Sequence, residues 1–429
     1  MWGMKHLGSF FFLIFICAGC VNGGHGAGGP PVPAGSPALG RGVKTILFDT
    51  SKSPTQMTAQ MTAQNISTPT SQAFDGFVVQ HMAGSKDNAA QGENFAWQAF
   101  DNTRHYSLTD RSADYIGDSF AAIKALPTAV MPERFLRINA SPYHPNGFDW
   151  LDNNYWNSVI ANMRVASQFA YGAGLRGVFL DTELYNSNVY SYSYWASNPN
   201  YAGMSYSALA TIVENRGRQF IQALNSSYPN LKIFISIGYT SVSQHVSRAN
   251  STQDLMMPFL DGMLGGSTPT TKFIDGFEES YWHDNNPNYF SSWASVIKGP
   301  NSYNVRFQKY PVQYLQQYQA SFALFLDRDR TVDLVDGVYG WCGGTKTNAF
   351  YSPARLAYTV QQAALSADNY VWFYSASVHP MVAGGGAPNY GLPLAYIQAI
   401  SKGRAAGNKL TSPLAQSTDD TPVATTCQP

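Results

Sequence analysis

The chain has 429 residues, a length that suits either several small domains or one α/β barrel with long loops. Lys and Arg number 27 and Asp and Glu number 27, so the formal net charge is zero, which argues against nucleic acid as a partner and against electrostatic docking on anionic lipid. Hydrophobic residues make up 44%, which excludes a disordered protein, and the 14% share of aromatic residues suits a neutral, hydroxyl-rich ligand such as a glycan, or simply a large core.

The N-terminus has the pattern of an export signal. A basic start precedes the apolar run 10–16, which is too short to span a bilayer and ends in Ala18-Gly19-Cys20. This ending resembles a bacterial lipobox, which implies a signal peptide over residues 1–19 and lipidation of Cys20. An ordinary signal peptide cut nearby is the alternative. We therefore expect a lipoprotein of the cell envelope or outer membrane, facing the periplasm or the exterior and touching the membrane only through its lipid.

Composition divides the rest of the chain into three parts. Residues 20–43 are rich in Gly, Pro and Ala and have nothing to bury, which predicts a tether. Residues 44–402 carry the pattern of a folded barrel, and residues 403–429 turn polar, which predicts a disordered tail. After cleavage only Cys342 and Cys427 would remain, so a disulfide framework is not indicated.

Eight short apolar runs alternate with amphipathic stretches along residues 44–402. The runs predicted as strands are Thr45–Asp49, Phe74–Gln80, Phe135–Asn139, Gly177–Glu183, Lys232–Ile237, Phe273–Glu279, Val335–Trp341 and Tyr370–Tyr374. Helices are predicted over Tyr155–Ala173, Tyr206–Leu224, Pro311–Leu326 and Ser352–Ala367. This alternation indicates parallel strands joined by crossover helices, and eight repeats favour a closed (β/α)8 TIM barrel with long βα loops over an open doubly wound sheet. No glycine-rich phosphate-binding motif follows the first strand, which counts against a nucleotide-binding fold.

Acidic residues gather where the fourth and sixth strands end, and this is the edge of a barrel that carries the active site. Strands aligned on the glycines Gly76, Gly177, Gly276 and Gly337 place alternate side chains on the barrel axis. Asp181, Glu183 and Glu278 then converge on one mouth. One such carboxylate alone is more often a helix cap or the partner of a buried cation, here Arg137, but three together favour catalysis.

Three carboxylates at one mouth can perform acid–base chemistry. Mutual repulsion and low dielectric should separate their pKa values, so that one serves as acid and another as base or nucleophile. Glycosidic cleavage needs such a pair. Glu279 is the alternative to Glu278 if the register is shifted by one residue.

Aromatic and polar side chains near the same strand ends are candidates for sugar binding, because flat rings stack on sugars and polar groups bond hydroxyls. The tyrosine-rich segment 185–206 and the segment 281–286 supply most of them. The alternative is that these loops pack on themselves and that the aromatic residues of the eighth strand fill the barrel. The candidates are Arg137, Asn139, Tyr185, Trp282, His283, Trp341, Trp372 and Tyr374.

The eight-strand layout, with the segment Gly177–Glu183 and with Glu278, resembles the (β/α)8-barrel glycoside hydrolases over about residues 44–400. The resemblance implies a glycosidase that cleaves an extracellular poly- or oligosaccharide by carboxylate catalysis. In the clan with glutamates after strands four and seven, Trp341 stands where the second glutamate is expected. The polygalactosamine-cleaving barrels have a similar fourth strand.

Two further subgroups imply different roles for the same carboxylates. By analogy with α-glycosidase clans that carry carboxylates after strands four and six, Asp181 would be the nucleophile and Glu278 the acid/base. By analogy with chitinase-type barrels, which share the Asp-x-Glu pattern and a tryptophan matching Trp372, Glu183 would be the acid and Asp181 would orient a substrate amide.

Two other classes of function remain open. A surface glycan-binding lipoprotein with a degenerate barrel would bind sugar without turnover. A metal-dependent barrel hydrolase is disfavoured, because its site usually needs a His-x-His pair or a comparable cluster, and the 8 histidines include no such pair. We therefore expect neither a metal nor a cofactor.

Overall fold

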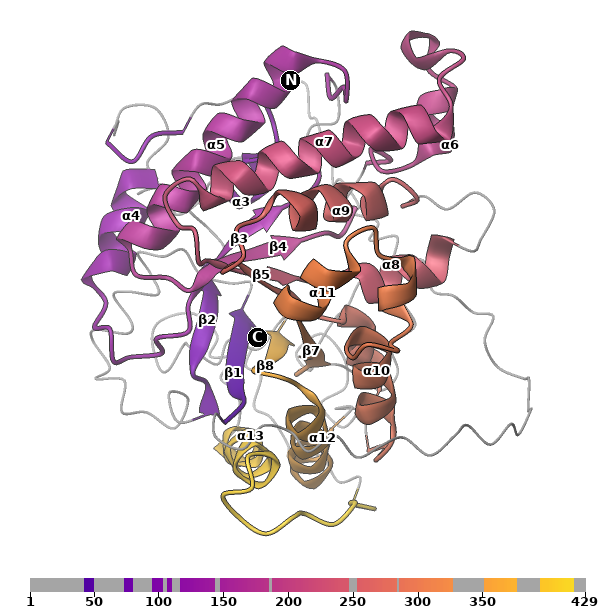
Figure 1. Ribbon diagram of the computed structural model, residues 1–429. Helices are drawn as coiled ribbons and strands as arrows, with labels where there is room; N and C mark the ends of the chain where they lie inside the picture. Colours follow the sequence, from indigo (N-terminus) through magenta and orange to yellow (C-terminus); the bar gives the residue numbers. More distant parts are fainter. Residues whose placement is uncertain are drawn as a thin grey trace, which may run out of the picture.

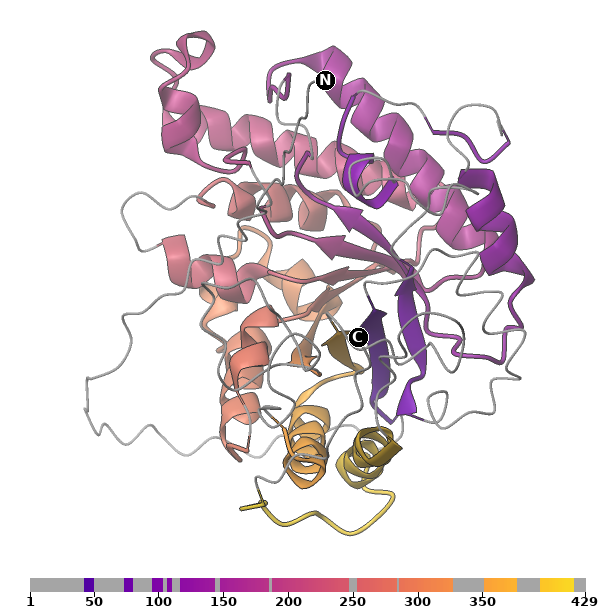
Figure 2. The same cartoon turned by 180° about the vertical axis from the view of Figure 1, so that it is seen from behind.

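The computed structural model describes residues 42–49, 73–79, 95–102, 106–109, 116–142, 147–184, 187–246, 253–283, 285–326, 351–375 and 394–419. Within these ranges the chain forms a closed barrel of eight parallel strands in sequence order, in which β8 pairs with β1. Helices surround the strands, as Figures 1 and 2 show from opposite sides. The predicted (β/α)8 barrel is confirmed.

The strands are β1 Lys44–Asp49, β2 Gly76–Val79, β3 Phe135–Asn139, β4 Gly177–Asp181, β5 Lys232–Ile235, β6 Lys272–Asp275, β7 Tyr318–Phe325 and β8 Tyr370–Ser375. The helices are α3 Phe95–Gln98, α4 Ile116–Ala125, α5 Asn153–Gly172, α6 Tyr192–Ala196, α7 Tyr206–Asn225, α8 Tyr239–Val246, α9 Met256–Gly266, α10 Tyr289–Ile297, α11 Pro311–Gln317, α12 Pro353–Ser366 and α13 Leu394–Gly407. The short 3-10 helices are η2 Pro199–Tyr201, η3 Glu278–Trp282 and η4 Asn304–Phe307. Seven of the eight strands fall on the predicted runs.

The prediction for the seventh strand was wrong. β7 lies in the segment predicted as one helix from Pro311 to Leu326, of which α11 takes only the first seven residues. Because β7 is buried on both faces, its sequence is a nearly continuous apolar run, and periodicity does not distinguish such a run from a buried helix. The run Val335–Trp341, which was predicted as the seventh strand, lies outside the described residues.

The inside of the barrel is filled by side chains from alternate strand positions. The inner cluster is Ile46, Phe48, Val78, Phe135, Phe179, Phe234, Ile274, Tyr281, Ala323, Phe325, Tyr370 and Trp372. Gly76, Gly177 and Gly276 each lie two residues from a member of this cluster and so face the barrel axis, as expected from the sequence. At Gly76 and Gly177 a Cβ atom would lie 1.7 Å from the carbonyl oxygen of Glu133 and 1.8 Å from that of Lys232, so the close approach of the neighbouring strand requires glycine.

A polar network lies at the end of the barrel where the strands begin. The Tyr370 hydroxyl donates to Glu133 Oε2 at 2.6 Å and accepts from Lys232 Nζ. The Nε atom of Arg176 lies 3.2 Å from Glu133 Oε1. The Tyr370 ring is 1% exposed, between Phe135 and the rest of the inner cluster. This packed end leaves the other end, where the strands finish, as the place for a substrate.

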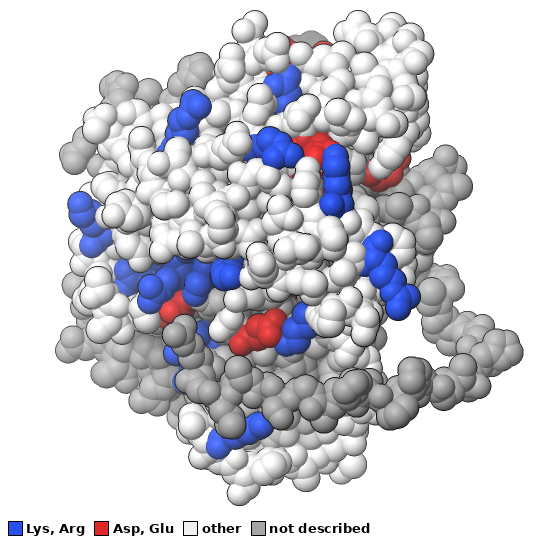
Figure 3. All heavy atoms as spheres, in the orientation of Figure 1, with Lys and Arg blue, Asp and Glu red and all other residues white. Residues whose placement is uncertain are grey.

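The C-terminal part remains in contact with the barrel beyond the boundary expected at Gly403. α13 continues to Gly407, and Asn408 then binds both backbone groups of Val43, accepting from the amide at 2.7 Å and donating to the carbonyl at 3.2 Å. The described chain ends at Asp419. None of the helices in the described ranges combines the length and apolar character that a membrane span needs. On the face drawn in Figure 3, charged side chains are sparse among neutral ones.

Candidate active site

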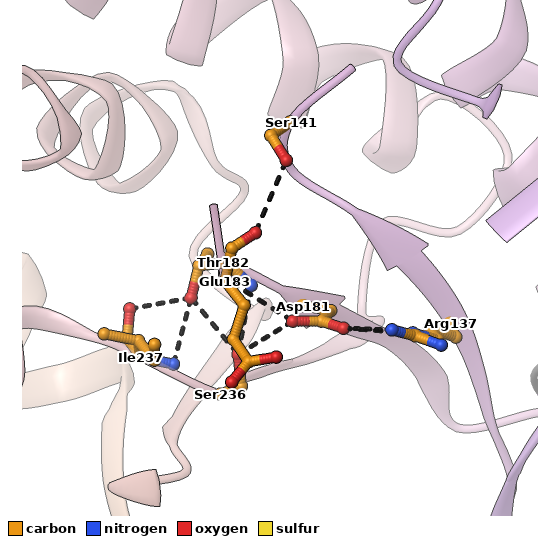
Figure 4. A network of polar contacts seen from close by, with 7 residues as sticks. All are labelled: Arg137, Ser141, Asp181, Thr182, Glu183, Ser236 and Ile237. Carbon is orange, nitrogen blue, oxygen red and sulfur yellow. Dashed lines mark hydrogen bonds and ion pairs between the residues drawn. The ribbon is translucent and has the colours of Figure 1, made fainter. Parts of the chain in front are cut away.

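Asp181 ends β4 and is held by Arg137 of β3, two residues before the end of that strand. The Arg137 Nε atom lies 3.1 Å from Asp181 Oδ2, and Nη2 bonds the same oxygen (Figure 4). Both side chains are buried, with 6% and 4% of their area exposed. The guanidinium lies 4.5 Å from the ring centre of Trp97 and 5.2 Å from that of Phe48. A fixed ion pair therefore stands at the base of the mouth.

The turn that follows β4 is fixed by hydrogen bonds to the end of β5 (Figure 4). Ser236 Oγ accepts from the Thr182 amide at 3.0 Å and donates to Asp181 Oδ1 at 3.5 Å. Thr182 Oγ1 bonds both backbone groups of Ile237, at 2.8 and 2.9 Å. The Glu183 amide donates to Asp181 Oδ1 at 3.2 Å. Asp181 thus fixes the backbone of Glu183 through this hydrogen bond.

A left-handed residue redirects the chain after β6. Phe277 has φ 39°, which is unusual for a residue with a bulky side chain and costs free energy. Its amide donates to the buried Asp275 carboxylate at 3.2 Å, and its ring lies 4.6 Å from that of Trp293 in the outer layer. These contacts hold the kink, which ends the strand and begins η3. Glu278, the first residue of η3, is thereby turned toward the mouth.

Glu278 meets the β4 carboxylates. Its side chain forms a hydrogen bond with Glu183, and burial, the charge of Glu183 and the charge of Asp181 raise the pKa of Glu278 well above its usual range. An ionised carboxylate only accepts hydrogen bonds, so a bond between two carboxyl groups requires a proton on one of them. The Glu183–Glu278 hydrogen bond therefore forms when one of the two groups carries a proton, and the raised pKa of Glu278 favours Glu278 as its holder. The structure brings together all three carboxylates that the sequence placed on the inward face.

Glu279 makes its side-chain contact elsewhere, although its charge adds a small contribution to the raised pKa of Glu278. Its carboxyl group contacts Ser241 of α8, and burial raises its pKa to about 7, with a smaller contribution from the charge of Asp275. The sixth strand was predicted to continue through Glu279, but β6 ends at Asp275, and the kink at Phe277 rather than the strand register brings Glu278 to the β4 carboxylates.

The position of Glu279 predicts a pH-dependent effect of Glu279→Gln. The folded-state pKa exceeds the ordinary value of 4.5, so this carboxyl group makes the protein less stable as pH rises from about 4.5 to about 7. We expect the Gln variant to exceed wild type in free energy of unfolding by about 1–3 kcal/mol at pH 8 and to match it near pH 4. Urea unfolding at both pH values measures the difference.

Glu214→Gln is the matched control for this experiment. Hydrogen bonds from Lys309 and Tyr310 outweigh the effect of burial and lower the pKa of Glu214, so its loss should destabilise the protein at pH 8 instead. Equal effects of the two substitutions at pH 8 would contradict the placement of Glu279.

The candidate aromatic residues divide between the barrel core and the mouth. Trp372 is 1% exposed, donates through Nε1 to the Gly276 carbonyl at 2.8 Å and packs 5.0 Å from Phe179, so it forms the floor under the carboxylates. Trp282 and Tyr374 are only partly buried against the inner cluster and can form the wall of the mouth. His283 is exposed and stacks on Tyr289 of α10 at 3.7 Å, in the outer layer. Tyr185, Trp341 and Cys20 lie outside the described residues.

Asn139 ends β3 on the inward face, paired in register with Asp181. It is 1% exposed, and its Oδ1 atom has no hydrogen-bond partner among the described residues. A buried amide oxygen without a partner is costly unless a ligand completes it. Asn139 is therefore available to a polar group of a substrate.

Much of the tyrosine-rich segment after β4 packs on itself. Tyr190, Trp195 and Tyr201 are each at most 3% exposed. The Tyr190 hydroxyl donates to the Ala140 carbonyl at 2.7 Å, and Trp195 Nε1 donates to the Val189 carbonyl at 2.8 Å. For these residues the alternative of a self-packed loop is correct.

Sequence reasoning missed three residues of the site. Ser236 lies in the predicted fifth strand, Lys232–Ile237, with the inward parity of Phe234, and this parity could have marked it as a site residue. Trp97, which packs on Arg137, belongs to a short helix in a segment with no strong periodicity. Tyr281 begins the segment 281–286 but was not among the candidates; it is buried in the inner cluster and packs 5.3 Å from Trp372. Across the part of the chain that the structure describes, no group of three or more His, Cys, Asp or Glu residues could hold a metal ion.

Comparisons with known proteins find likeness in architecture only. No family model and no curated protein matches the sequence. The solved structures that resemble it include a family GH18 chitinase from Chromobacterium violaceum, with 10% identity, TM-score 0.41 and coverage of 88% of this chain and 87% of the other. A hyperthermophilic endocellulase from the archaeon Pyrococcus horikoshii has 10% identity, TM-score 0.41 and coverage of 85% and 92%. A sugar phosphate isomerase/epimerase from Parabacteroides distasonis has 9% identity, TM-score 0.31 and coverage of 87% and 97%. Such distant likenesses assign no chemistry to this chain.

Proposed function

We propose that the protein is a glycoside hydrolase that cleaves a poly- or oligosaccharide with the carboxyl groups at the barrel mouth. One observation carries the proposal: Glu278 lies beside Glu183 and Asp181 at the mouth, where burial and the neighbouring charges raise the pKa of Glu278 and Asp181 is paired with the buried Arg137. A proton donor next to a fixed carboxylate is what cleavage of a glycosidic bond requires.

The three carboxylates take different roles in this proposal. The Glu183–Glu278 pair donates its proton to the departing glycosidic oxygen, and the ionised member of the pair then serves as base toward water. Asp181, fixed by Arg137, supplies the standing negative charge that stabilises positive charge developing at the anomeric carbon. Catalysis in this scheme needs no metal and no cofactor, as we expect from the sequence.

The surrounding side chains support a carbohydrate substrate. Trp282 and Tyr374 offer partly exposed rings for stacking on a sugar face, and the Oδ1 atom of Asn139 can accept from a sugar hydroxyl or an acetamido N–H. The low charge of the chain agrees with a neutral substrate rather than an anionic one.

A polysaccharide panel with carboxylate variants tests the proposal. We expect wild-type protein to release reducing ends from at least one glycan and Glu183→Gln to lower the rate by about 10²–10⁴-fold, because the amide can neither share nor accept the proton. Glu214→Gln, which removes a carboxylate of α7 that pairs with Lys309, is the matched control and should retain wild-type activity. Glycan binding without turnover in wild type would favour the non-catalytic glycan-binding alternative. Full activity of Glu183→Gln would refute the assignment.

We also propose that the chain is exported and held in the cell envelope by a lipid on Cys20. The support is the sequence pattern at residues 10–20. Metabolic labelling with a fatty acid should mark the wild-type protein and leave it in the membrane fraction, whereas Cys20→Ser should be unlabelled and soluble. Identical labelling and fractionation of the two proteins would contradict a lipid anchor at this residue.

A further inference from the structure

The C-terminal segment returns to the mouth of the barrel. α13 lies so close to α12 that a Cβ atom at Gly403 would be 2.2 Å from the Ala357 carbonyl oxygen. The chain reverses at Lys409, which has φ 58°, and residues 410–419, here called the strap, run back along α12. The Leu414 amide donates to Gln361 Oε1 at 2.6 Å. In Figure 1 the strap is the yellow loop that passes α13 and α12.

The far end of the strap lies at the start of α12. Ser352 caps that helix and also donates through Oγ to the carbonyl of Asp419. Because α12 leads from the carboxyl end of β7 to the amino end of β8, its first turn lies on the side of the mouth. The ten residues of the strap are long enough to span the 14-residue helix, since an extended chain rises more than twice as far per residue as a helix.

At the mouth the strap binds Asn285, three residues after Trp282. Gln416 Nε2 donates to the Asn285 carbonyl at 2.6 Å, and Asn285 Nδ2 donates to the Ser417 carbonyl at 2.8 Å. The Asn285 amide donates to Thr359 Oγ1 of α12 at 3.2 Å. With φ 48°, Asn285 reverses the chain that leaves η3, and these contacts hold the reversal.

The two ends of η3 are anchored separately. Ser280 Oγ donates to the Ala323 carbonyl and accepts from its amide, at 2.8 and 2.7 Å, which fixes the Glu278 end on β7. On the Trp282 side, His283 donates its amide to the Ser280 carbonyl and stacks on Tyr289, and Asn285 beyond it makes three hydrogen bonds, two of them to the strap. Loss of the strap should therefore disturb Trp282 more than Glu278.

We propose that the strap is a positioning element that holds Trp282 against the mouth for substrate binding, an inference that rests on the proposed glycosidase function. Gln416→Ala should raise KM by about three- to tenfold, the contribution of one ordered aromatic contact, with kcat changed by less than about twofold. Deletion of residues 410–429 should raise KM further. Asn408→Ala, which breaks a tie of the same segment to Val43, is the matched control and should leave KM unchanged.

Hydrogen exchange makes the test independent of activity. In both strap variants we expect faster exchange of the amides of residues 281–288, with unchanged exchange in β3 and β4. If wild type hydrolyses no glycan, the proposed function fails while exchange still decides the role of the strap. If the strap is purely structural, both variants should have a lower Tm, while KM and the exchange rates of residues 281–288 stay at their wild-type values. This result would overturn the proposal.

Discussion

Glu278→Gln is expected to lower kcat by about 10²–10⁴-fold while glycan affinity stays within a few-fold of wild type. The amide keeps the shape of the side chain and can still donate a hydrogen bond to Glu183, but it carries no transferable proton. Binding contacts through the aromatic wall and Asn139 are untouched. Steady-state kinetics on the best glycan of the panel, with affinity measured by calorimetry, separate the two effects.

The same substitution is expected to change the pH dependence of stability. Because the pKa of Glu278 in the folded protein lies above its unfolded value of 4.5, the folded state keeps a proton that the unfolded chain releases, and wild-type stability falls as pH rises above about 4.5. The Gln variant has no proton to lose at this position, so its free energy of unfolding should exceed that of wild type in alkaline solution and equal it near pH 4. Glu279→Gln, the adjacent control, should share the stability gain but retain wild-type kcat. A Glu278→Gln protein with wild-type turnover would remove Glu278 from the mechanism.

Arg137→Met is the second substitution with a large expected effect, this time on folding. It leaves the Asp181 carboxylate buried without its counter-charge, which costs about 3–5 kcal/mol in free energy of unfolding. Activity should also be lost, because Asp181 loses its fixed orientation beside Glu183. Urea unfolding at pH 7 and a glycan assay measure the two consequences.

A double variant distinguishes a buried ion pair from simple loss of packing. Arg137→Met combined with Asp181→Asn removes both charges, so most of the stability should return while activity stays absent. The control is Arg404→Met: Arg404 pairs with Asp75, but both side chains are more than 20% exposed, so the cost should be about 0–1 kcal/mol. Additive losses in the double variant would show that the pair is not coupled.

Most of the barrel was predictable because its strands repeat one physical pattern. Apolar runs bounded by helices specify parallel strands, and the glycines required by close strand contact fix the pleat that puts Asp181 on the inward face. Glu278 was expected on that face as part of the sixth strand, but the kink at Phe277 brings it there instead. β7 was missed because a strand buried on both faces carries no alternation, and the preceding Pro311 suited a longer helix.

The rest of the site depends on contacts between distant segments. Nothing local to residues 95–98 indicates that Trp97 packs on Arg137, and nothing near Phe277 indicates a left-handed kink, since the outer-layer packing of its ring sustains it. The buried tyrosines after β4 have the same composition as a sugar-binding loop, and only their packing distinguishes the two.

Infrared difference titration of wild type against Glu278→Gln tests the central claim most directly, because it observes the protonation of this one carboxyl group. We expect a protonated carboxyl band that persists in wild type at pH values well above the ordinary Glu pKa of 4.5 and is missing from the Gln variant. A Glu278 that ionises near the ordinary value of 4.5 would contradict a proton shared with Glu183 and, with it, the proposed catalytic role.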